Sequence, residues 1–329
     1  MINIYLCNPN EFSIRKNPNL NNKDGRFENV KKIKNLDKTS TKKALILCDN
    51  TIQHGIKCIN NNYKLFKDYD RVIYYSNEIY WDTISTDKEF QGLIDSCKIK
   101  LDLILNFFID KPFKLKNINY ITTTGVCSQI ANLYLQKYKK KFVSLDKCDL
   151  KWNMICKFGA PKEERINFHK KLKDYKSFIY SINNFKYPNG DYLSKRFPSE
   201  LNKIGDYKSW SLPDEDFQSV SELIIETRLT QYQNSSNLVS CTEKTLKAFL
   251  FKRPTIFVID KNAFSYLENY GFKFVDYFKQ DNLEKICEMD IKKLIELSMD
   301  YSDVWEHNHQ NLIEFIHQDE NKFINFIGY

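Results

Sequence analysis

The chain has 329 residues, of which 42% are hydrophobic, 15% aromatic and 28% charged, and it contains only 9 glycines. These values exclude disordered, collagen-like and fibrous proteins. Lys and Arg outnumber Asp and Glu by 50 to 42, which gives a net charge of +8. That charge favours an anionic partner such as a nucleotide, a nucleic acid or an acidic glycan, although a Lys-rich and Asn-rich coding bias explains it equally well.

The cysteines and the N-terminal residues indicate the cellular compartment of the protein. Nine cysteines form no C-x-x-C pair and no Cys/His cluster with zinc spacing, so we expect reduced thiols. We expect no export signal, because the first residues, MINIYLCNPNEF, lack a basic region followed by a long apolar one. No run of about 18 apolar residues occurs, so no membrane span is expected either. The predicted location is the cytoplasm.

The first part of the chain alternates between short apolar runs and longer amphipathic stretches. Asn, Lys and Asp dominate residues 8–43 and indicate an irregular lead-in. Helices are predicted over 89–108 and 127–141. Buried parallel strands are predicted at 43–49, 70–77, 118–125 and 140–146. This alternation predicts an α/β domain over residues 1–150.

A second series of the same kind begins near residue 151. Helices are predicted over 161–175, 242–251 and 262–271, and a long loop over 187–216. Strands are predicted at 151–159, 177–183, 221–227, 254–260 and 272–278. Helical spacing of apolar residues from 282 onward predicts a helical C-terminus that crosses back over the first unit. We therefore expect a second α/β domain over 151–329, and a ligand site at the carboxyl ends of strands, in the cleft between the domains.

No glycine-rich nucleotide-binding motif occurs in the sequence, neither G-x-G-x-x-G nor G-x-x-x-x-G-K-[ST]. A helix N-terminus, together with Arg or Lys side chains, is the alternative way to bind phosphate. Thr242 stands at an N-cap position, and Glu243, Lys244 and Lys247 follow in the first turns. Glu226 ends the preceding predicted strand. The plain alternative is a capped helix start with a surface acid that compensates the helix dipole.

Residues 219–258, SVSELIIET…CTEKTLKAFLFKRPTIFV, resemble the donor-site signature of the alpha-1,3-fucosyltransferase family of GT-B glycosyltransferases. They are also similar to phage-encoded relatives that carry a TEKT-x-K motif before a Pro-led strand. Upstream, residues 151–175 resemble the segment that opens the C-terminal domain of these enzymes, and Arg165 is the matching arginine. The resemblance covers roughly residues 150 to 280.

The resemblance implies a GT-B-like α/β fold, with two Rossmann-like domains facing a cleft and a helical C-terminus. The C-terminal domain would bind a UDP- or GDP-linked sugar as co-substrate, with no further cofactor and no metal. The acceptor, a glycan or a modified DNA base, would bind to the N-terminal domain, and transfer to its hydroxyl would be inverting. Glu243 would be the ribose ligand, Lys244 and Arg165 would contact the diphosphate, and Glu226 would be a further pocket residue. From the helix start itself we add Thr242 and Lys247 as candidate binding residues.

The chain also departs from the family pattern. The family has Glu-Asn-Ser where this chain has Glu226, Thr227 and Arg228, the gap to Thr242 is longer, and no glycine follows the strand after Pro254. These changes fall near the base and sugar ends of the donor pocket, so the identity of the donor stays open.

Inverting transfer needs a general base, a carboxylate or a histidine from the first domain. Glu78 is our choice among four candidates near predicted strand ends, the others being Asp49, His54 and Asp82. His169 is interpreted as an exposed surface residue. The terminal histidines are interpreted as structural: His307, His309 and His317.

One basic stretch, LQKYKKKF at 135–142, interleaves lysines with aromatic residues. It is typical either of a solvated helix end or of a surface that follows a nucleic-acid backbone. The alternative function is therefore a non-catalytic, nucleic-acid-binding protein on a GT-B scaffold.

Overall fold

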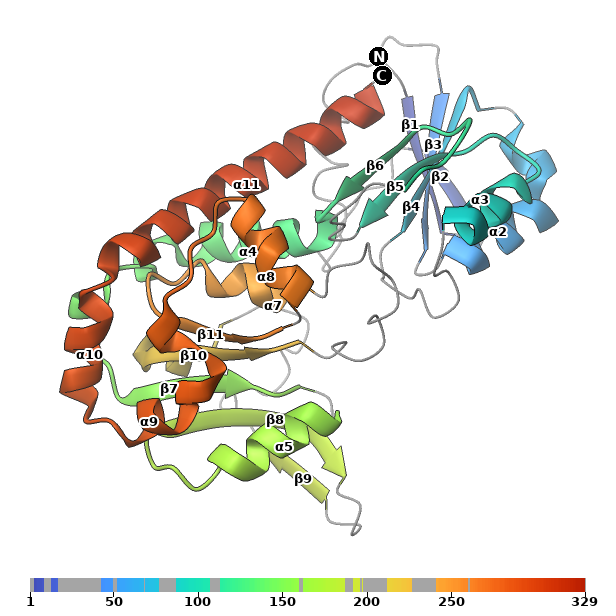
Figure 1. Ribbon diagram of the computed structural model, residues 1–329. Coiled ribbons are helices and arrows are strands. Elements are labelled where there is room, and N and C mark those ends of the chain that lie inside the picture. The colour runs from blue at the N-terminus through green and yellow to red at the C-terminus, as the bar shows by residue number, and fades with distance from the viewer. Residues whose placement is uncertain are drawn as a thin grey trace. The chain divides into compact units, whose positions relative to one another are not determined.

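Figure 1 shows the computed structural model of the chain. By contact the described residues divide into two units, the first comprising 3–129 and 316–328 and the second 130–226 and 241–315. The predicted domain boundary at residue 150 stays a prediction. The structure describes residues 3–8, 13–16, 43–49, 52–67, 69–76, 87–106, 113–159, 162–186, 192–195, 197, 212–226, 241–259 and 261–328.

The first unit is built on a six-stranded sheet in the order β2-β1-β3-β4-β5-β6. All neighbours pair in parallel except β2, which is antiparallel to β1. Parallel strands require crossover connections, which is why helices separate most of them in the sequence. The strands are β1 (Asn3–Asn8), β2 (Ser13–Lys16), β3 (Lys43–Asp49), β4 (Arg71–Ser76), β5 (Asp102–Asn106) and β6 (Tyr120–Thr123).

Helices cover both faces of this sheet (Figure 1). Helices α2 (Ile52–Asn61) and α3 (Asp87–Asp95) pack on one face, where Ile56 and Phe90 join the strand residues in one buried cluster. On the other face, Phe323 and Ile327 from the end of α11 (Ser302–Gly328) pack on alternate strand residues such as Ile73. The C-terminal helix therefore completes the core of the first unit.

The second unit has a five-stranded sheet in the order β11-β10-β7-β8-β9. The first four are parallel, and β9 pairs with β8 in antiparallel orientation. Strand β10, which lies between β11 and β7, is buried at all of its positions, as is usual in a parallel sheet covered on both faces. The strands are β7 (Trp152–Lys157), β8 (Phe178–Lys186), β9 (Tyr192–Lys195), β10 (Ser219–Ile225) and β11 (Thr255–Val258).

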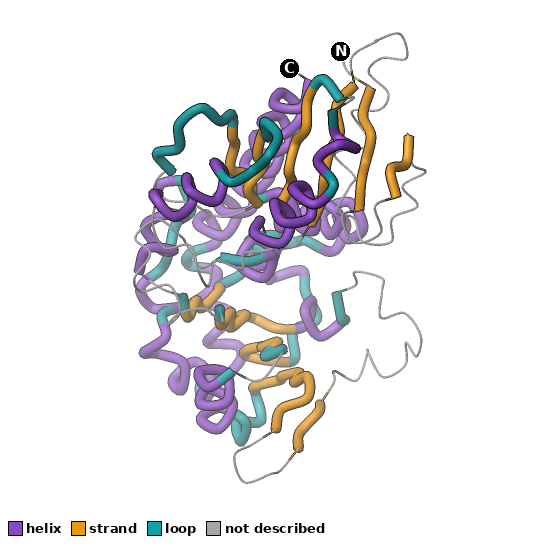
Figure 2. Tube along the Cα trace, turned by 90° about the vertical axis from the view of Figure 1, so that its right-hand side faces the viewer, coloured by secondary structure: helices purple, strands orange, loops and turns teal. Residues whose placement is uncertain are grey.

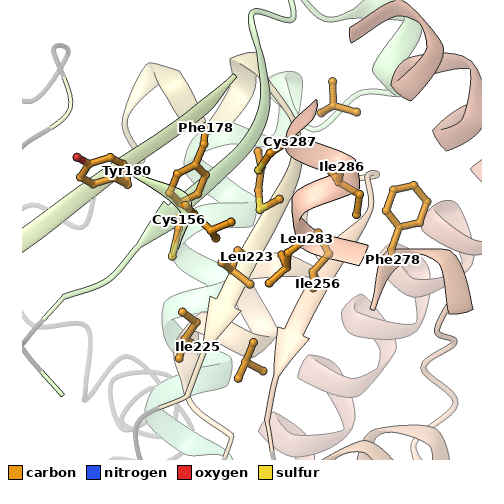
Figure 3. Close-up of a cluster of buried hydrophobic side chains, with 14 of the residues drawn as sticks. Cys156, Phe178, Tyr180, Leu223, Ile225, Ile256, Phe278, Leu283, Ile286 and Cys287 are labelled. Carbon is orange, nitrogen blue, oxygen red and sulfur yellow. The ribbon is translucent and has the colours of Figure 1, made fainter. Parts of the chain in front are cut away.

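The main core of the second unit joins this sheet to the helices near the C-terminus (Figure 3). Leu223 and Ile256 from the strands pack there with Leu283 and Ile286, and Trp305 of α11 belongs to the same cluster. In Figure 2 helices accompany the strands of each unit. The helices not yet given are α4 (Gly125–Tyr138), α5 (Glu163–Leu172), α7 (Glu243–Ala248), α8 (Lys261–Asn269), α9 (Leu283–Glu288) and α10 (Ile291–Met299).

Short 3-10 turns complete the regular structure. One of them, η1 (Tyr63–Phe66), belongs to the first unit. Those of the second unit are η2 (Lys139–Lys141), η3 (Leu145–Lys147), η4 (Asp214–Gln218), η5 (Asp276–Phe278) and η6 (Gln280–Asn282). Within the described residues, no helix combines the length and the apolar character needed to cross a bilayer.

The predicted α/β class is confirmed in both units, each with a Rossmann-like set of parallel strands, but five local predictions were wrong. One is the loop over 187–216, in which residues 192–195 form β9. Strands β1 and β2 were not predicted, and β2 lies in the stretch expected to be irregular. The helix predicted over 89–108 ends at Asp95, and residues 102–106 form β5, because Leu103, Ile104 and Leu105 are a continuous apolar run that is buried on both faces.

The two other wrong predictions are the strands at 140–146 and 272–278. In the first, Phe142 and Leu145 are buried from turns η2 and η3 rather than from a strand. In the second, residues 272–275 have no regular structure and η5 follows them. Apolar runs this short indicate burial, but they do not by themselves decide between a strand and a turn.

Candidate functional site

The carboxyl end of β10 is tied to the start of α7 by Glu226. The Glu226 side chain is fully buried, and it accepts hydrogen bonds from the backbone nitrogen of Thr242 at 3.0 Å and from Thr242 Oγ1 at 2.8 Å. Thr245 Oγ1 donates to it at 2.5 Å. Burial raises the pKa of Glu226, and the charge of Lys244 together with these donors opposes the rise. In this structure the carboxylate is therefore an internal anchor for the helix.

Thr242 is the N-cap of α7, as predicted. Its Oγ1 accepts a hydrogen bond from the backbone nitrogen of Lys244 at 3.3 Å while donating to Glu226. A hydroxyl can do both at once because it carries one donor and two acceptor positions. The helix start is thus fixed from two sides, by its own cap and by the preceding strand.

Glu243 and Lys244 occupy the first turn of α7, and both are half-buried. Neither forms an ion pair within the part of the chain that the structure describes. The backbone that carries these two side chains is held by Thr242 and Glu226.

Arg165 of α5 lies against the same strand end. It is 3% exposed, and its Nη2 donates to the carbonyl oxygen of Ile225 at 3.2 Å. Burial lowers the pKa of Arg165, and the nearby charges of Glu226 and Glu243 oppose this. The structure therefore brings Arg165 together with the Thr-Glu-Lys segment, although they are far apart in the sequence.

Gly159 leaves the space that the Arg165 guanidinium occupies. Its φ is +63°, and a Cβ on it would lie 3.1 Å from Arg165 Nη1. A left-handed backbone favours glycine, and a side chain here would also press on the guanidinium. This glycine is thus part of how the arginine is positioned.

Lys247, the last predicted donor contact, points into the protein. Its Nζ lies 2.7 Å from Glu222, and Arg253 Nη2 lies 2.9 Å from the same carboxylate. Lys157 and Asp216 form a further ion pair beside them. Burial alone would raise the pKa of Glu222, but the surrounding cations lower it to about 2. Lys247 is therefore engaged internally in this structure.

This ion network was not predicted from the sequence. Its one signal was Glu222, a carboxylate in the middle of an otherwise apolar strand. A buried charge of this kind needs a partner, but the spacing of Lys247 and Arg253 along the chain does not identify them as those partners.

The predicted general base cannot be placed. Glu78 and Asp82 lie outside the described residues, and of Asp49 and His54 only the backbone is described, in β3 and α2. These roles stay predictions.

One polar cluster in the first unit was not predicted. Asp319 of α11 accepts hydrogen bonds from the backbone nitrogen and the Oγ1 of Thr124, both at 3.0 Å, and Thr124 Oγ1 also contacts Ser128 Oγ. Thr124 directly precedes α4, so Asp319 receives an N–H at the start of that helix. The cluster holds the end of α11 on the first unit.

The histidine predictions had mixed outcomes. His169 is 2% exposed, so the expectation of an exposed residue was wrong. It lies on the inner face of α5 with Arg165, and its ring contacts the rings of Phe158 and Tyr180 edge-on. Burial lowers the pKa of His169 to about 4. His309 Nδ1 lies 2.7 Å from the carbonyl oxygen of Leu250, in keeping with a structural role.

Comparison with known proteins gives no identity. The chain matches none of the family models, and no curated protein is significantly similar to it. Within the described residues, no group of three or more His, Cys, Asp or Glu side chains is arranged to hold a metal ion.

Proposed function

We propose that the protein is a glycosyltransferase that binds a nucleotide-activated sugar at the carboxyl end of β10. The observation that carries the proposal is the pair Glu243 and Lys244, half-buried and without an ion-pair partner among the described residues, held beside Arg165. Ligands of open parallel sheets bind at this end of the strands. The resemblance of residues 150 to 280 to GT-B glycosyltransferases supports the same assignment.

Each side chain has a distinct role in this proposal. The Glu243 carboxylate accepts hydrogen bonds from the ribose hydroxyls, and the Lys244 ammonium group pairs with the diphosphate. Arg165 adds a second positive charge, and its burial strengthens the electrostatic attraction between this charge and the diphosphate. Glu226 and Lys247 are positioning residues, because their charged groups are already engaged inside the protein.

The reaction follows from these charges. A base of the first unit takes the proton of the acceptor hydroxyl, and the oxygen forms a bond to the anomeric carbon of the sugar while the bond to the diphosphate oxygen breaks. The leaving diphosphate gains negative charge, which Lys244 and Arg165 stabilise. Inversion at the anomeric carbon follows from a single displacement. The proposed architecture is GT-B-like, and the acceptor is a glycan or a modified DNA base.

Thermal shift and calorimetry with UDP-, GDP- and CMP-linked sugars test the proposal. One donor class should stabilise the protein, and Lys244→Ala should weaken its binding by about tenfold or more, as expected for the loss of one charge-assisted contact. Lys292→Ala, which changes an exposed lysine of α10, is the matched control. The absence of stabilisation by any donor would refute the donor site.

Two further measurements separate the residue assignment from the activity. Arg165→Lys keeps the charge but removes the planar fork, and unchanged affinity in both Arg165→Lys and Lys244→Ala would reject the assigned contacts. Mass spectrometry of glycan and hydroxymethylated DNA acceptors after incubation with the best donor detects the transferred sugar. A donor that binds without any transfer to these acceptors would argue against catalysis.

The second candidate function is non-catalytic binding of nucleic acid. It is favoured by Lys137, Lys139 and Lys140, which are exposed at and after the end of α4. It predicts DNA binding that weakens steeply with salt, and no stabilisation by nucleotide sugars. Replacing the three lysines with glutamine would abolish that binding, whereas donor binding in the first proposal would be unaffected.

A further inference from the structure

Strand β11 lies at the edge of the second sheet, and no strand among the described residues pairs with its outer side. On its inner side, the carbonyl oxygens of Pro254 and Val258 accept hydrogen bonds from the backbone nitrogens of Glu222 and Glu226, both at 3.1 Å. Alternate residues of a parallel strand face opposite sides, so the backbone groups of Thr255 and Phe257 point away from β10. Within the described residues, no backbone hydrogen bond reaches these N–H and C=O groups, which we call the free edge of β11.

The segment 272–275, part of the strand predicted at 272–278, is hydrogen-bonded to a side chain of α11. Asn308 exchanges two hydrogen bonds of 2.8 Å with the backbone of Lys273, in the way a neighbouring strand would. Asn311 Nδ2 donates to the carbonyl oxygen of Tyr270 at 2.7 Å. In the described part of the chain, no backbone hydrogen bond joins 272–275 to β11. The space of a missing strand is therefore kept open.

A cavity of about 530 Å³ occupies this region. The volume lies within the range of small-molecule sites, roughly 300–1,000 Å³. Aromatic side chains from both sides of the sheet line it, among them Phe257, Phe264 and Phe274 on one side and Phe278 and Trp305 on the other. A flat ring lying in the plane of the sheet would contact aromatic groups on both of its faces.

The polar and charged groups of the cavity decide which hydrogen bonds and which charge a ligand can have. Arg253 lines the cavity and is 4% exposed, and its Nε has no acceptor among the described residues. Buried donors of this kind usually have a partner, so a ligand acceptor would satisfy it. Arg253 is paired with Glu222, and the other charged residues that line the cavity balance in number, with Lys261, Lys273 and Lys279 against Glu268, Asp276 and Asp281. The cavity therefore does not favour a polyanion.

We propose that this cavity binds a flat, uncharged heteroaromatic ring of the nucleobase class. The free edge of β11 offers alternating donors and acceptors to the edge of the ring, Arg253 offers a further donor, and the aromatic side chains stack on its faces. None of Arg165, Glu243 and Lys244 lines the cavity, so this site is separate from the proposed donor site and does not depend on it.

The four common ribonucleosides are the probes, and binding is followed by calorimetry and by tryptophan fluorescence. Trp305 lines the cavity and is one of 4 tryptophans, so Trp305→Phe should remove most of the fluorescence change and leave the calorimetric binding in place. Ser265→Trp fills the mouth of the cavity from an exposed position of α8, and it should weaken binding by about tenfold or more. Asn262→Trp places the same side chain on an exposed position of α8 outside the cavity and should have no effect.

Several results would overturn the proposal. One is that no nucleoside gives saturable binding. Another is binding that survives Ser265→Trp but is lost in Lys244→Ala, because that result assigns the nucleoside to the donor site. Tighter binding of a nucleoside monophosphate than of the nucleoside, abolished by Ser265→Trp, would contradict the uncharged ring. Circular dichroism of each variant confirms that folding is retained before affinities are compared.

Discussion

The buried ion network of the second unit gives an ordered prediction for two single substitutions. Glu222 and Lys247 have side chains that are 1% and 7% exposed, and the Glu222 carboxylate contacts both Lys247 and Arg253. Together with the pair of Lys157 and Asp216, the network contains three cations and two carboxylates. The perturbations are Glu222→Gln and Lys247→Met, which remove opposite charges at similar side-chain volume.

The two substitutions differ in what they leave behind. Glu222→Gln leaves three cations, two of them buried, facing a single carboxylate, and breaking a buried pair in this way costs about 3–5 kcal/mol. Lys247→Met leaves two cations and two carboxylates, and Glu222 keeps Arg253 at 2.9 Å. Its cost is the loss of one charge-assisted hydrogen bond, about 1.5–3 kcal/mol.

Urea unfolding at neutral pH measures both free energies, at a pH well above the lowered pKa of Glu222 at about 2. The more exposed pair of Lys252 and Glu306, with side chains 21% and 47% exposed, serves as control. Glu306→Gln should cost less than about 1 kcal/mol. The reasoning is refuted if Lys247→Met destabilises the protein as much as Glu222→Gln does, or if both costs fall to that of the control.

Two further substitutions test the cores. The pKa of His169 is lowered to about 4 from an ordinary 6.5, so the unfolded chain binds a proton before the folded protein does as the pH falls. The free energy of unfolding of the wild type should therefore decrease between pH 6.5 and pH 4. Urea unfolding at these two pH values should show a smaller decrease for His169→Leu. Phe323→Ala removes a fully buried ring of α11 from the core of the first unit and should lower the free energy of unfolding by about 3–5 kcal/mol in the same measurement. A loss below about 1 kcal/mol, roughly that of a surface substitution, would show that the end of the helix does not pack there.

The sequence predicted the class of fold because parallel strands leave a strong pattern. Runs such as residues 43–49 and 221–225 are apolar, β-branched and bounded by polar residues, and both are strands. Residues 102–106 show the limit of this reasoning. The three-residue apolar run Leu103–Leu105, placed after a helix, reads as the continuation of that helix, and only pairing with β4 and β6 makes it part of a strand.

The candidate site was predictable in part for the same reason. The cap at Thr242 is a local feature, so spacing alone identifies it. The partners of Glu226 and Lys247 depend on which elements meet in space, and the sequence does not encode that locally. The segment 272–275 also depends on such a contact. Its alternating apolar residues predict a strand, but the side-chain amide of Asn308, which is distant in the sequence, forms hydrogen bonds with its backbone instead.

Helix α11 has a consequence for the order of events during synthesis. One uninterrupted helix supplies Trp305 to the core of the second unit and Phe323 to that of the first. On the ribosome, the strands of the first sheet emerge long before Phe323 does, and one face of that sheet lacks its cover throughout this interval. An N-terminal domain usually folds completely before the rest of the chain is made, but the first unit of this chain cannot complete its core in that order. Its first unit completes this core only after the second unit has been translated.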